Sequence, residues 1–182
     1  MGGVNYELEH FLFKNISFHF CSFAYRIDVL NQYKIRFTVN SKYGEDEEFT
    51  WKYLCHCKTS VSINEVLYCY RTNPQSATQR ISWLRTDGLD SMIRVYEYYK
   101  QNKHPFAKEL LTFGIPREKL YILKLFAKAK RWDLYTKLLE SNDYKQYDII
   151  KLLRFPDIRI RAIALLQRIS PYLCYQALRK FS

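Results

Sequence analysis

The prediction of the fold starts from one acidic stretch, Tyr43-Gly44-Glu45-Asp46-Glu47-Glu48-Phe49. Its glycine frees the backbone for a turn, and its four acids then occupy the first turn of a predicted helix. Acidic side chains favour this position because the helix macrodipole places partial positive charge at the N-terminus. Apolar residues continue at helical spacing, since Phe49, Tyr53 and Cys57 fall at i, i+4 and i+8 and Trp51 and Leu54 widen the stripe.

The crowding of the four acids gives a functional interpretation beside the structural one. Like charges this close oppose full ionisation, which suits a carboxylate that takes up a proton. Glu45 and Asp46 are consecutive and point in different directions, so only one of them is expected to face a substrate. Glu48 and Lys52 stand at i and i+4, the favourable order for a helix ion pair, and Glu48 is predicted to face solvent.

The rest of the chain divides at about residue 80. Before it, short strands are predicted at 35–37, 59–63 and 66–71 from their β-branched and aromatic residues, which gives an α/β pattern for residues 1–80. After the turn signal Asn73-Pro74 the strand character ends, and residues 81–182 are predicted to be an all-α extension. Its helices are expected near 85–102, 105–113, 117–130, 132–141, 143–154 and 157–180, with punctuation such as Gly114-Ile115-Pro116 between them.

Composition and charge restrict the class of protein. The 182 residues are 48% apolar and carry a formal charge of +11, and residues 81–182 hold 20 Lys/Arg against 10 Asp/Glu. The five cysteines are an odd number without a compact framework, which indicates reduced thiols. No secretion signal and no apolar run of spanning length is found. These features predict a cytoplasmic protein, compatible with a peripheral position on the inner face of the cell membrane.

Several motifs occur in a fixed order: Tyr25-Arg26, Ile35-Arg36-Phe37, the acidic stretch, Tyr68-Cys69-Tyr70-Arg71 and Ser76. This order resembles the C-terminal half of bacterial family-2 glycosyltransferases, which build capsular and other surface polysaccharides. The resemblance covers roughly residues 15–80. It implies part of a GT-A fold, an α/β sandwich that binds a nucleotide-sugar in its first half and the acceptor in its second.

The resemblance also implies roles for single residues. In inverting transferases of this family, the Asp of the Glu-Asp motif deprotonates the acceptor hydroxyl, which then attacks the anomeric carbon. Carried over, Asp46 is the general base, and Glu45 positions it or binds the acceptor sugar. Arg71, with Tyr70 and Ser76, is expected near the diphosphate or the acceptor, where a guanidinium can bind phosphate.

The donor side of such an enzyme is not found in the sequence. The family holds the nucleotide-sugar with an Asp-x-Asp pair and a divalent metal, Mg or Mn, and no Asp-x-Asp occurs in this chain. The chain alone is therefore expected to bind no cofactor and to be inactive. Its expected partners are a saccharide or lipid-linked acceptor and, through a missing half, the nucleotide-sugar.

Two other groups of residues give weaker signals, one for a metal site and one for nucleic-acid binding. Cys55-His56-Cys57 resembles a metal cluster, but two thiols two residues apart on a helix point about 200° apart. Tyr96, Tyr98 and Tyr99 beside basic residues could stack on bases, yet no nucleic-acid motif accompanies them. Neither a metal site nor a nucleic-acid partner is predicted.

The basic tail supports a second hypothesis, a non-catalytic helical module that binds a membrane or a protein. Residues 151–182 carry seven Lys/Arg and one acid, Asp157. Six residues form a broad apolar stripe along it: Ile158, Ala162, Leu165, Leu166, Ile169 and Leu173. Such a helix docks on its neighbours or lies on an anionic membrane surface, and the sequence leaves both alternatives open.

Overall fold

The computed structural model describes residues 8, 9, 12, 20–61, 63, 65–69, 71 and 80–180, and 65% of these residues are helical. The helical elements in chain order are η1 Phe20–Ser22, α2 Ile27–Gln32, α3 Glu45–Leu54, η3 Trp83–Thr86, α4 Asp87–Gln101, α5 Ala107–Glu109, η4 Leu110–Gly114, α6 Ile115–Lys128, α7 Trp132–Glu140, η5 Ile149–Arg154, α8 Ile158–Ile169 and α9 Pro171–Lys180. The described part of the chain contains no strand and is all-α.

The predicted α/β sandwich is therefore wrong. The described residues of 35–37, 59–63 and 66–71 are irregular or extended, apart from an isolated bridge at Thr59. Four apolar side chains in the second and third segments are exposed: Val61, Ile63, Val66 and Leu67. A strand needs a neighbour for its backbone hydrogen bonds and a packed layer over one face, and the described chain supplies neither.

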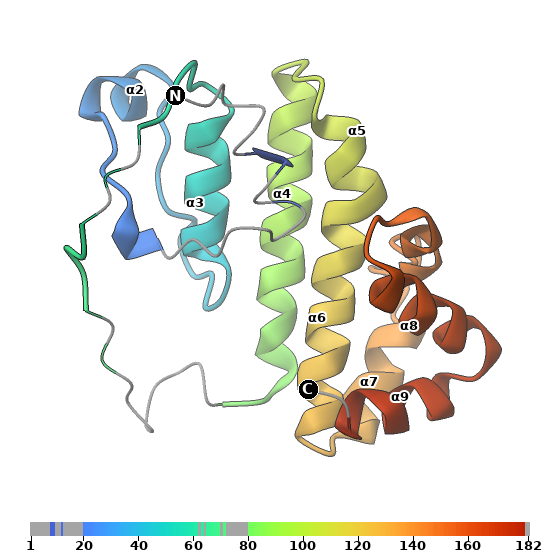
Figure 1. Cartoon of the computed structure of the whole chain (residues 1–182). Helices are drawn as coiled ribbons and strands as arrows, with labels where there is room; N and C mark the ends of the chain where they lie inside the picture. The colour runs from blue at the N-terminus through green and yellow to red at the C-terminus, as the bar shows by residue number, and fades with distance from the viewer. Residues whose placement is uncertain are drawn as a thin grey trace.

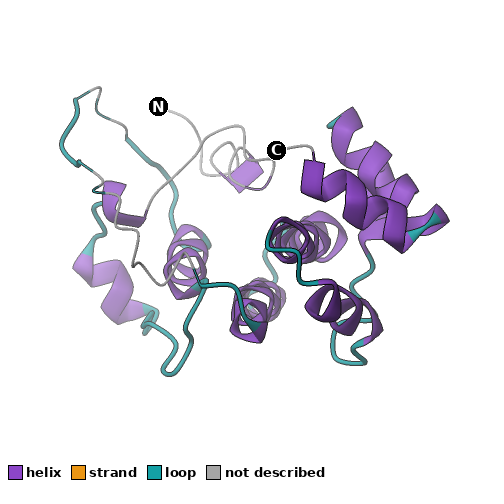
Figure 2. Ribbon diagram, turned by 90° about the horizontal axis from the view of Figure 1, so that it is seen from below, coloured by secondary structure: helices purple, strands orange, loops and turns teal. Residues whose placement is uncertain are grey.

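The main helices pack in sequence order. Figure 1 shows α3, α4 and the rod formed by α5 and α6 side by side, and α7, α8 and α9 lie beyond α6. Seen from below, the helices form a row with α8 and α9 at one end (Figure 2). This order brings the acidic helix α3 against α4 and leaves the basic helices α8 and α9 at the opposite side of the molecule.

One large hydrophobic core joins these helices. In α4 the buried residues Leu89, Met92 and Val95 follow one face, as the helical period requires. Trp51 and Leu54 of α3 belong to the same core, so residues from both sides of position 80 share it. The other face of α3 buries Phe49 and Tyr53 in a small second cluster with Ile35. The residues of the single stripe predicted for α3 are thus divided between two clusters, and the helix is packed on two faces.

The break expected at Gly114-Ile115-Pro116 is absent, because the backbone stays helical from Ala107 to Lys128. The turn Leu110–Gly114 is a π-helix. Proline has no N–H and its ring clashes with the carbonyl four residues earlier, here Thr112. A wider π turn just before Pro116 accommodates that clash without ending the rod.

Three helices end in the same way, with lysine where glycine is favoured. Lys34, Lys103 and Lys130 follow α2, α4 and α6 at positive φ of 51°, 52° and 59°. After α4, His104 N donates to Tyr99 O at 2.9 Å and Lys103 N donates to Lys100 O at 3.0 Å. These bonds define the Schellman motif, which closes the open carbonyls of a helix end.

Within the described ranges, no helix combines the length and the apolar character that crossing a lipid bilayer requires.

Candidate functional site

Gly44 sets the position at which the acidic helix begins. It is the N-cap residue of α3, with φ of +78°, in the left-handed region that favours glycine. A Cβ at this position would lie only 2.9 Å from the Cα of Gly88 in α4. Glycine is required both by the turn and by the close approach of the two backbones, which fixes the first turn of α3 against α4.

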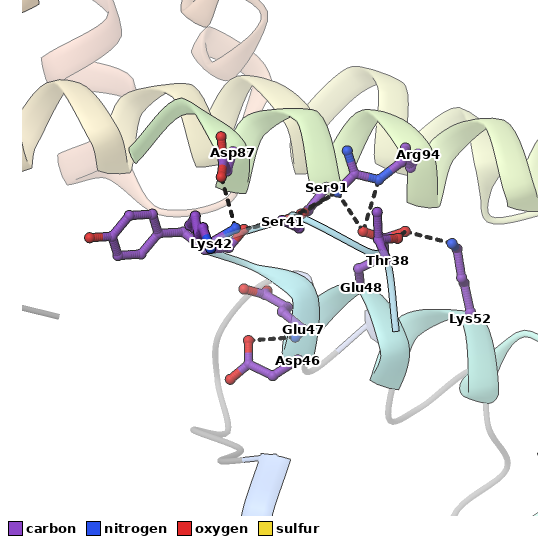
Figure 3. Close-up of polar contacts among 11 residues, drawn as sticks. Thr38, Ser41, Lys42, Asp46, Glu47, Glu48, Lys52, Asp87, Ser91 and Arg94 are labelled. Carbon is purple, nitrogen blue, oxygen red and sulfur yellow. Dashed lines mark hydrogen bonds and ion pairs between the residues drawn. The ribbon is translucent and has the colours of Figure 1, made fainter. Parts of the chain in front are cut away.

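Asp46, the predicted base, lies exposed in that first turn. One carboxylate oxygen accepts a hydrogen bond from Glu47 N at 2.7 Å, and the Asp46 carbonyl accepts one from Thr50 Oγ1 at 2.9 Å. Figure 3 shows the Asp46 side chain pointing away from α4. No cation of the described chain lies within ion-pair distance of Asp46 or of the half-buried Glu45. The Asp46 carboxylate is therefore accessible to a hydroxyl group that approaches from solvent.

Glu48 forms the ion pair that its spacing predicts but is buried instead of exposed. The predicted ion pair is confirmed, since Lys52 Nζ lies 2.5 Å from Glu48 Oε1. The predicted solvent exposure is wrong, because Glu48 is only 2% exposed. Thr38 Oγ1 donates to Oε1 at 2.8 Å, and Arg94 donates to Oε2 from Nε at 2.9 Å and from Nη2 at 2.7 Å (Figure 3). Glu48 is the electrostatic anchor of α3 on α4.

Burial and hydrogen bonding have opposite effects on the pKa of Glu48. Burial by itself raises the pKa of its carboxyl, but the hydrogen bonds from Arg94, Lys52 and Thr38 outweigh burial and leave the pKa below its ordinary value. The group is ionised at neutral pH and its acceptor sites are occupied. Of the four acids, Glu48 is thus excluded as a proton acceptor, and the functional interpretation rests on Asp46.

The Tyr25-Arg26 motif contacts α3 from the other side. Tyr25 Oη lies 2.8 Å from Thr50 Oγ1, and Arg26 N donates to Tyr53 Oη at 2.9 Å. Burial raises the pKa of Tyr25 to about 12, and the charge of Asp46 acts in the same direction. Arg26 has extended backbone, and α2 begins at the next residue, Ile27.

A polar hollow of about 180 Å³ opens between the segment before α3 and the start of α4. Its lining consists of backbone and side chains from two segments: Thr38, Val39, Asn40, Ser41, Asp87, Asp90 and Arg94. Asp87 accepts a hydrogen bond from Lys42 N at 2.8 Å, and Asp90 accepts one from Tyr144 Oη at 2.9 Å. Burial raises the pKa of Asp90. The two acids are therefore used to hold neighbouring segments.

Sequence reasoning did not find the residues that anchor α3. Arg94 lies 46 positions from Glu48 and 53 from Ser41, to which Nη2 also donates at 3.3 Å. No local spacing signals a contact over such a distance. The one available signal was an arginine four residues after Asp90 on the same helix, and it says nothing of α3.

The predicted substrate-binding residues are not brought to Asp46. Tyr70 and Ser76 lie outside the described residues. Arg71 is exposed, and no hydrogen bond or ion pair connects it with the described part of α3. The assignment of Arg71, Tyr70 and Ser76 to the substrate stays a prediction.

The residues around Cys55-His56-Cys57 serve packing. His56 stacks on Tyr33 with ring centroids 3.5 Å apart, and its Nε2 lies 2.6 Å from Tyr98 Oη. Burial raises the pKa of Cys55 to about 11. Among the residues that the structure describes, no three His, Cys, Asp or Glu side chains gather as a metal site would require.

Comparison with known proteins adds no further constraint, since no family model, no curated protein and no solved structure matches the chain.

Proposed function

We propose that this chain supplies the acceptor side of an inverting glycosyltransferase, with Asp46 as the general base. The observation that carries the proposal is the contrast within one helical turn. Asp46 is exposed and forms no ion pair with any described residue, whereas Glu48, two residues later, is buried and bound by Arg94, Lys52 and Thr38. Glu48 holds the turn against α4, and Asp46 stays accessible to solvent.

The order of motifs supports the same assignment. Tyr25-Arg26 and the acidic turn stand in the order typical of the polysaccharide-building family, and Tyr25-Arg26 contacts the helix that follows the acidic turn, at Thr50 and Tyr53. The proposal needs no sheet within this chain. It needs a carboxylate on a fixed turn, which Gly44 and Glu48 provide.

The proposed reaction transfers one proton and one sugar. The Asp46 carboxylate takes the proton of an acceptor hydroxyl as that oxygen attacks the anomeric carbon of a nucleotide-sugar. The bond between the anomeric carbon and the diphosphate breaks on the opposite face, and the electron pair leaves with the nucleoside diphosphate. Glu45 positions the base or the acceptor, and Arg71 binds a phosphate oxygen with its guanidinium.

The donor sugar is bound by a half that these residues do not contain. A divalent metal on the diphosphate is expected only with that half and stabilises the leaving group there. The proposed partners of this chain are a saccharide or lipid-linked acceptor and the donor-binding half. The chain alone is expected to give no turnover.

The test measures sugar transfer by the chain together with its donor-binding half. Membranes carrying that protein are supplied with a panel of radiolabelled nucleotide-sugars, and label in lipid-linked saccharide is counted. Asp46→Asn is expected to lower transfer by about 10²- to 10⁴-fold, the usual contribution of a general base. Glu47→Gln, one position along the same turn, is the matched control and should keep most of the activity. Transfer by Asp46→Asn at the rate of the control would refute the assignment.

A second candidate function, a non-catalytic helical interaction module, is favoured by a separate observation. Helices α8 and α9 expose large apolar side chains beside arginines at the side of the molecule away from α3.

A further inference from the structure

We propose that the exposed face of α8 and the start of α9 binds the surface of an anionic lipid membrane. The face consists of an apolar ridge: Ile158, Ala162, Leu165 and Ile169 on α8, with Tyr172 and Leu173 on α9. The four α8 residues stand at i, i+4, i+7 and i+11, so they share one side of the helix. Ile158 and Ile169 are 70% and 69% exposed, and Leu165 is 49% exposed.

The ridge is exposed although α8 is firmly attached to the body. Its opposite side buries Ala164 and Gln167, and Tyr135 Oη of α7 donates to Gln167 Oε1 at 2.5 Å. Cys174 of α9 is fully buried and its Sγ lies 3.7 Å from Ile163 O. Of the apolar stripe predicted from the sequence, Leu166 packs against the core, whereas the residues of the ridge are exposed. The ridge is therefore available for another surface.

Charge decides which surface the ridge fits. Arg161 and Arg168 lie along one edge of the ridge and are exposed, and neither pairs with an acid of the described chain. Asp157, the one acid from residue 151 onward, caps α8 and pairs with Arg159 at 2.9 Å. The face therefore presents apolar side chains and unpaired positive charge together.

This combination fits a bilayer with anionic headgroups. Apolar side chains of an interfacial helix enter the boundary between headgroups and acyl chains, while arginines stay beside the phosphates. Tyr172 suits the same depth, because tyrosine is enriched at membrane interfaces. A second copy of this chain fits poorly, since its ridge carries the same two arginines and neither α8 nor α9 contains an acid that could pair with them.

The test is flotation of the purified chain with vesicles made of equal parts phosphatidylglycerol and phosphatidylcholine. We expect the protein to float with these vesicles at low salt, to float much less in about 0.5 M salt, and to stay behind with pure phosphatidylcholine. Arg161→Gln combined with Arg168→Gln should weaken binding by about 25-fold, about fivefold for each charge near the surface. Leu165→Ser combined with Ile169→Ser should weaken it as well.

A matched control removes two charges from the far side of the molecule. Lys42→Gln combined with Lys58→Gln, both exposed residues flanking α3, should bind as the unchanged protein does. All variants change exposed side chains, and circular dichroism checks that they are folded. If the arginine double variant and the lysine double variant lost vesicle binding equally, binding would depend on net charge alone, and the proposal would be overturned. Absence of flotation would overturn it as well, including the case in which sedimentation shows a ridge-dependent dimer.

The proposal does not depend on sugar transfer. Asp46→Asn should float as the unchanged chain does, because Asp46 lies on α3, away from the ridge. Loss of transfer without loss of flotation, or the reverse, separates the two proposals.

Discussion

The guanidinium of Arg94 donates two hydrogen bonds to a single oxygen of the buried Glu48 carboxylate, from Nε at 2.9 Å and from Nη2 at 2.7 Å. The pair joins α3 to α4 across 46 positions of sequence. Lys52 occupies the other oxygen at 2.5 Å. A buried carboxylate is tolerated only when its acceptor sites are filled, so this arrangement fixes the orientation of the acidic turn.

Removing Arg94 should therefore destabilise the chain. We expect Arg94→Ala to lower the free energy of unfolding by about 2 to 3 kcal/mol, because a buried charge loses its strongest partner while Lys52 and Thr38 remain. Urea unfolding followed by circular dichroism measures the change. Lys100→Ala breaks an exposed ion pair with Glu97 at 3.6 Å and should cost less than about 1 kcal/mol. Equal costs for the two variants would contradict the anchoring role of Arg94.

Stability should also fall in acid through Glu48. Its pKa in the folded chain is below the ordinary value of 4.5, so the folded state binds fewer protons than the unfolded state near that pH. The contribution of ionised Glu48 to the free energy of unfolding is fully present above pH 4.5, and it is lost as the pH falls through the pKa of Glu48 in the folded state. Glu48→Gln should flatten the slope of unfolding free energy between about pH 3 and pH 5. A slope that Glu48→Gln does not alter would exclude Glu48 as its source.

Gly44 and Lys103 should respond in opposite directions to a change of side chain. Gly44→Ala adds a Cβ at φ of +78° and 2.9 Å from the Cα of Gly88, and we expect a loss of about 1 to 3 kcal/mol. Lys103→Gly removes a Cβ at φ of 52° and should stabilise the chain by as much as about 1 kcal/mol. Thermal unfolding compares them. Stabilisation by Gly44→Ala would show that α3 does not start in the left-handed turn.

The hydroxyl of Tyr135 should be required for the attachment of α8. Tyr135→Phe leaves Gln167 Oε1 buried without its donor at 2.5 Å, and we expect a cost of about 1 to 3 kcal/mol. Hydrogen exchange should report faster opening of α8. Tyr172→Phe changes an exposed tyrosine nearby and should be nearly neutral. An equally small effect of both variants would mean that α8 is held by apolar contacts alone.

Local signals in the sequence were sufficient for most helices. The acidic start at Glu45 and the periodicity of α4 and α6 predicted helices close to those observed, and Asp157 caps α8 at the start of the helix predicted near 157–180. Capping and periodicity depend on residues within a few positions of each other, and sequence displays these directly.

The predictions that failed share one physical origin, because the sequence does not show which residues of other segments pack against a given side chain. Val66 lies in a segment that has the composition of a strand, but its side chain is 89% exposed, because the described chain provides no neighbouring strand. Glu48 and Lys52 have the spacing of a surface ion pair, but Glu48 is buried and accepts hydrogen bonds from Arg94 of another helix. Leu165 belongs to an apolar stripe that sequence alone could place inside or outside the body.

The sequence by itself determined where most helices form and that an acidic turn follows a glycine, because those properties are set by nearest neighbours along the chain. Only the tertiary structure decided which acid is buried and which is exposed, since Arg94 reaches Glu48 from a different helix. It also decided that the apolar ridge of α8 faces solvent, because Tyr135 and Gln167 hold the opposite side of that helix to the body.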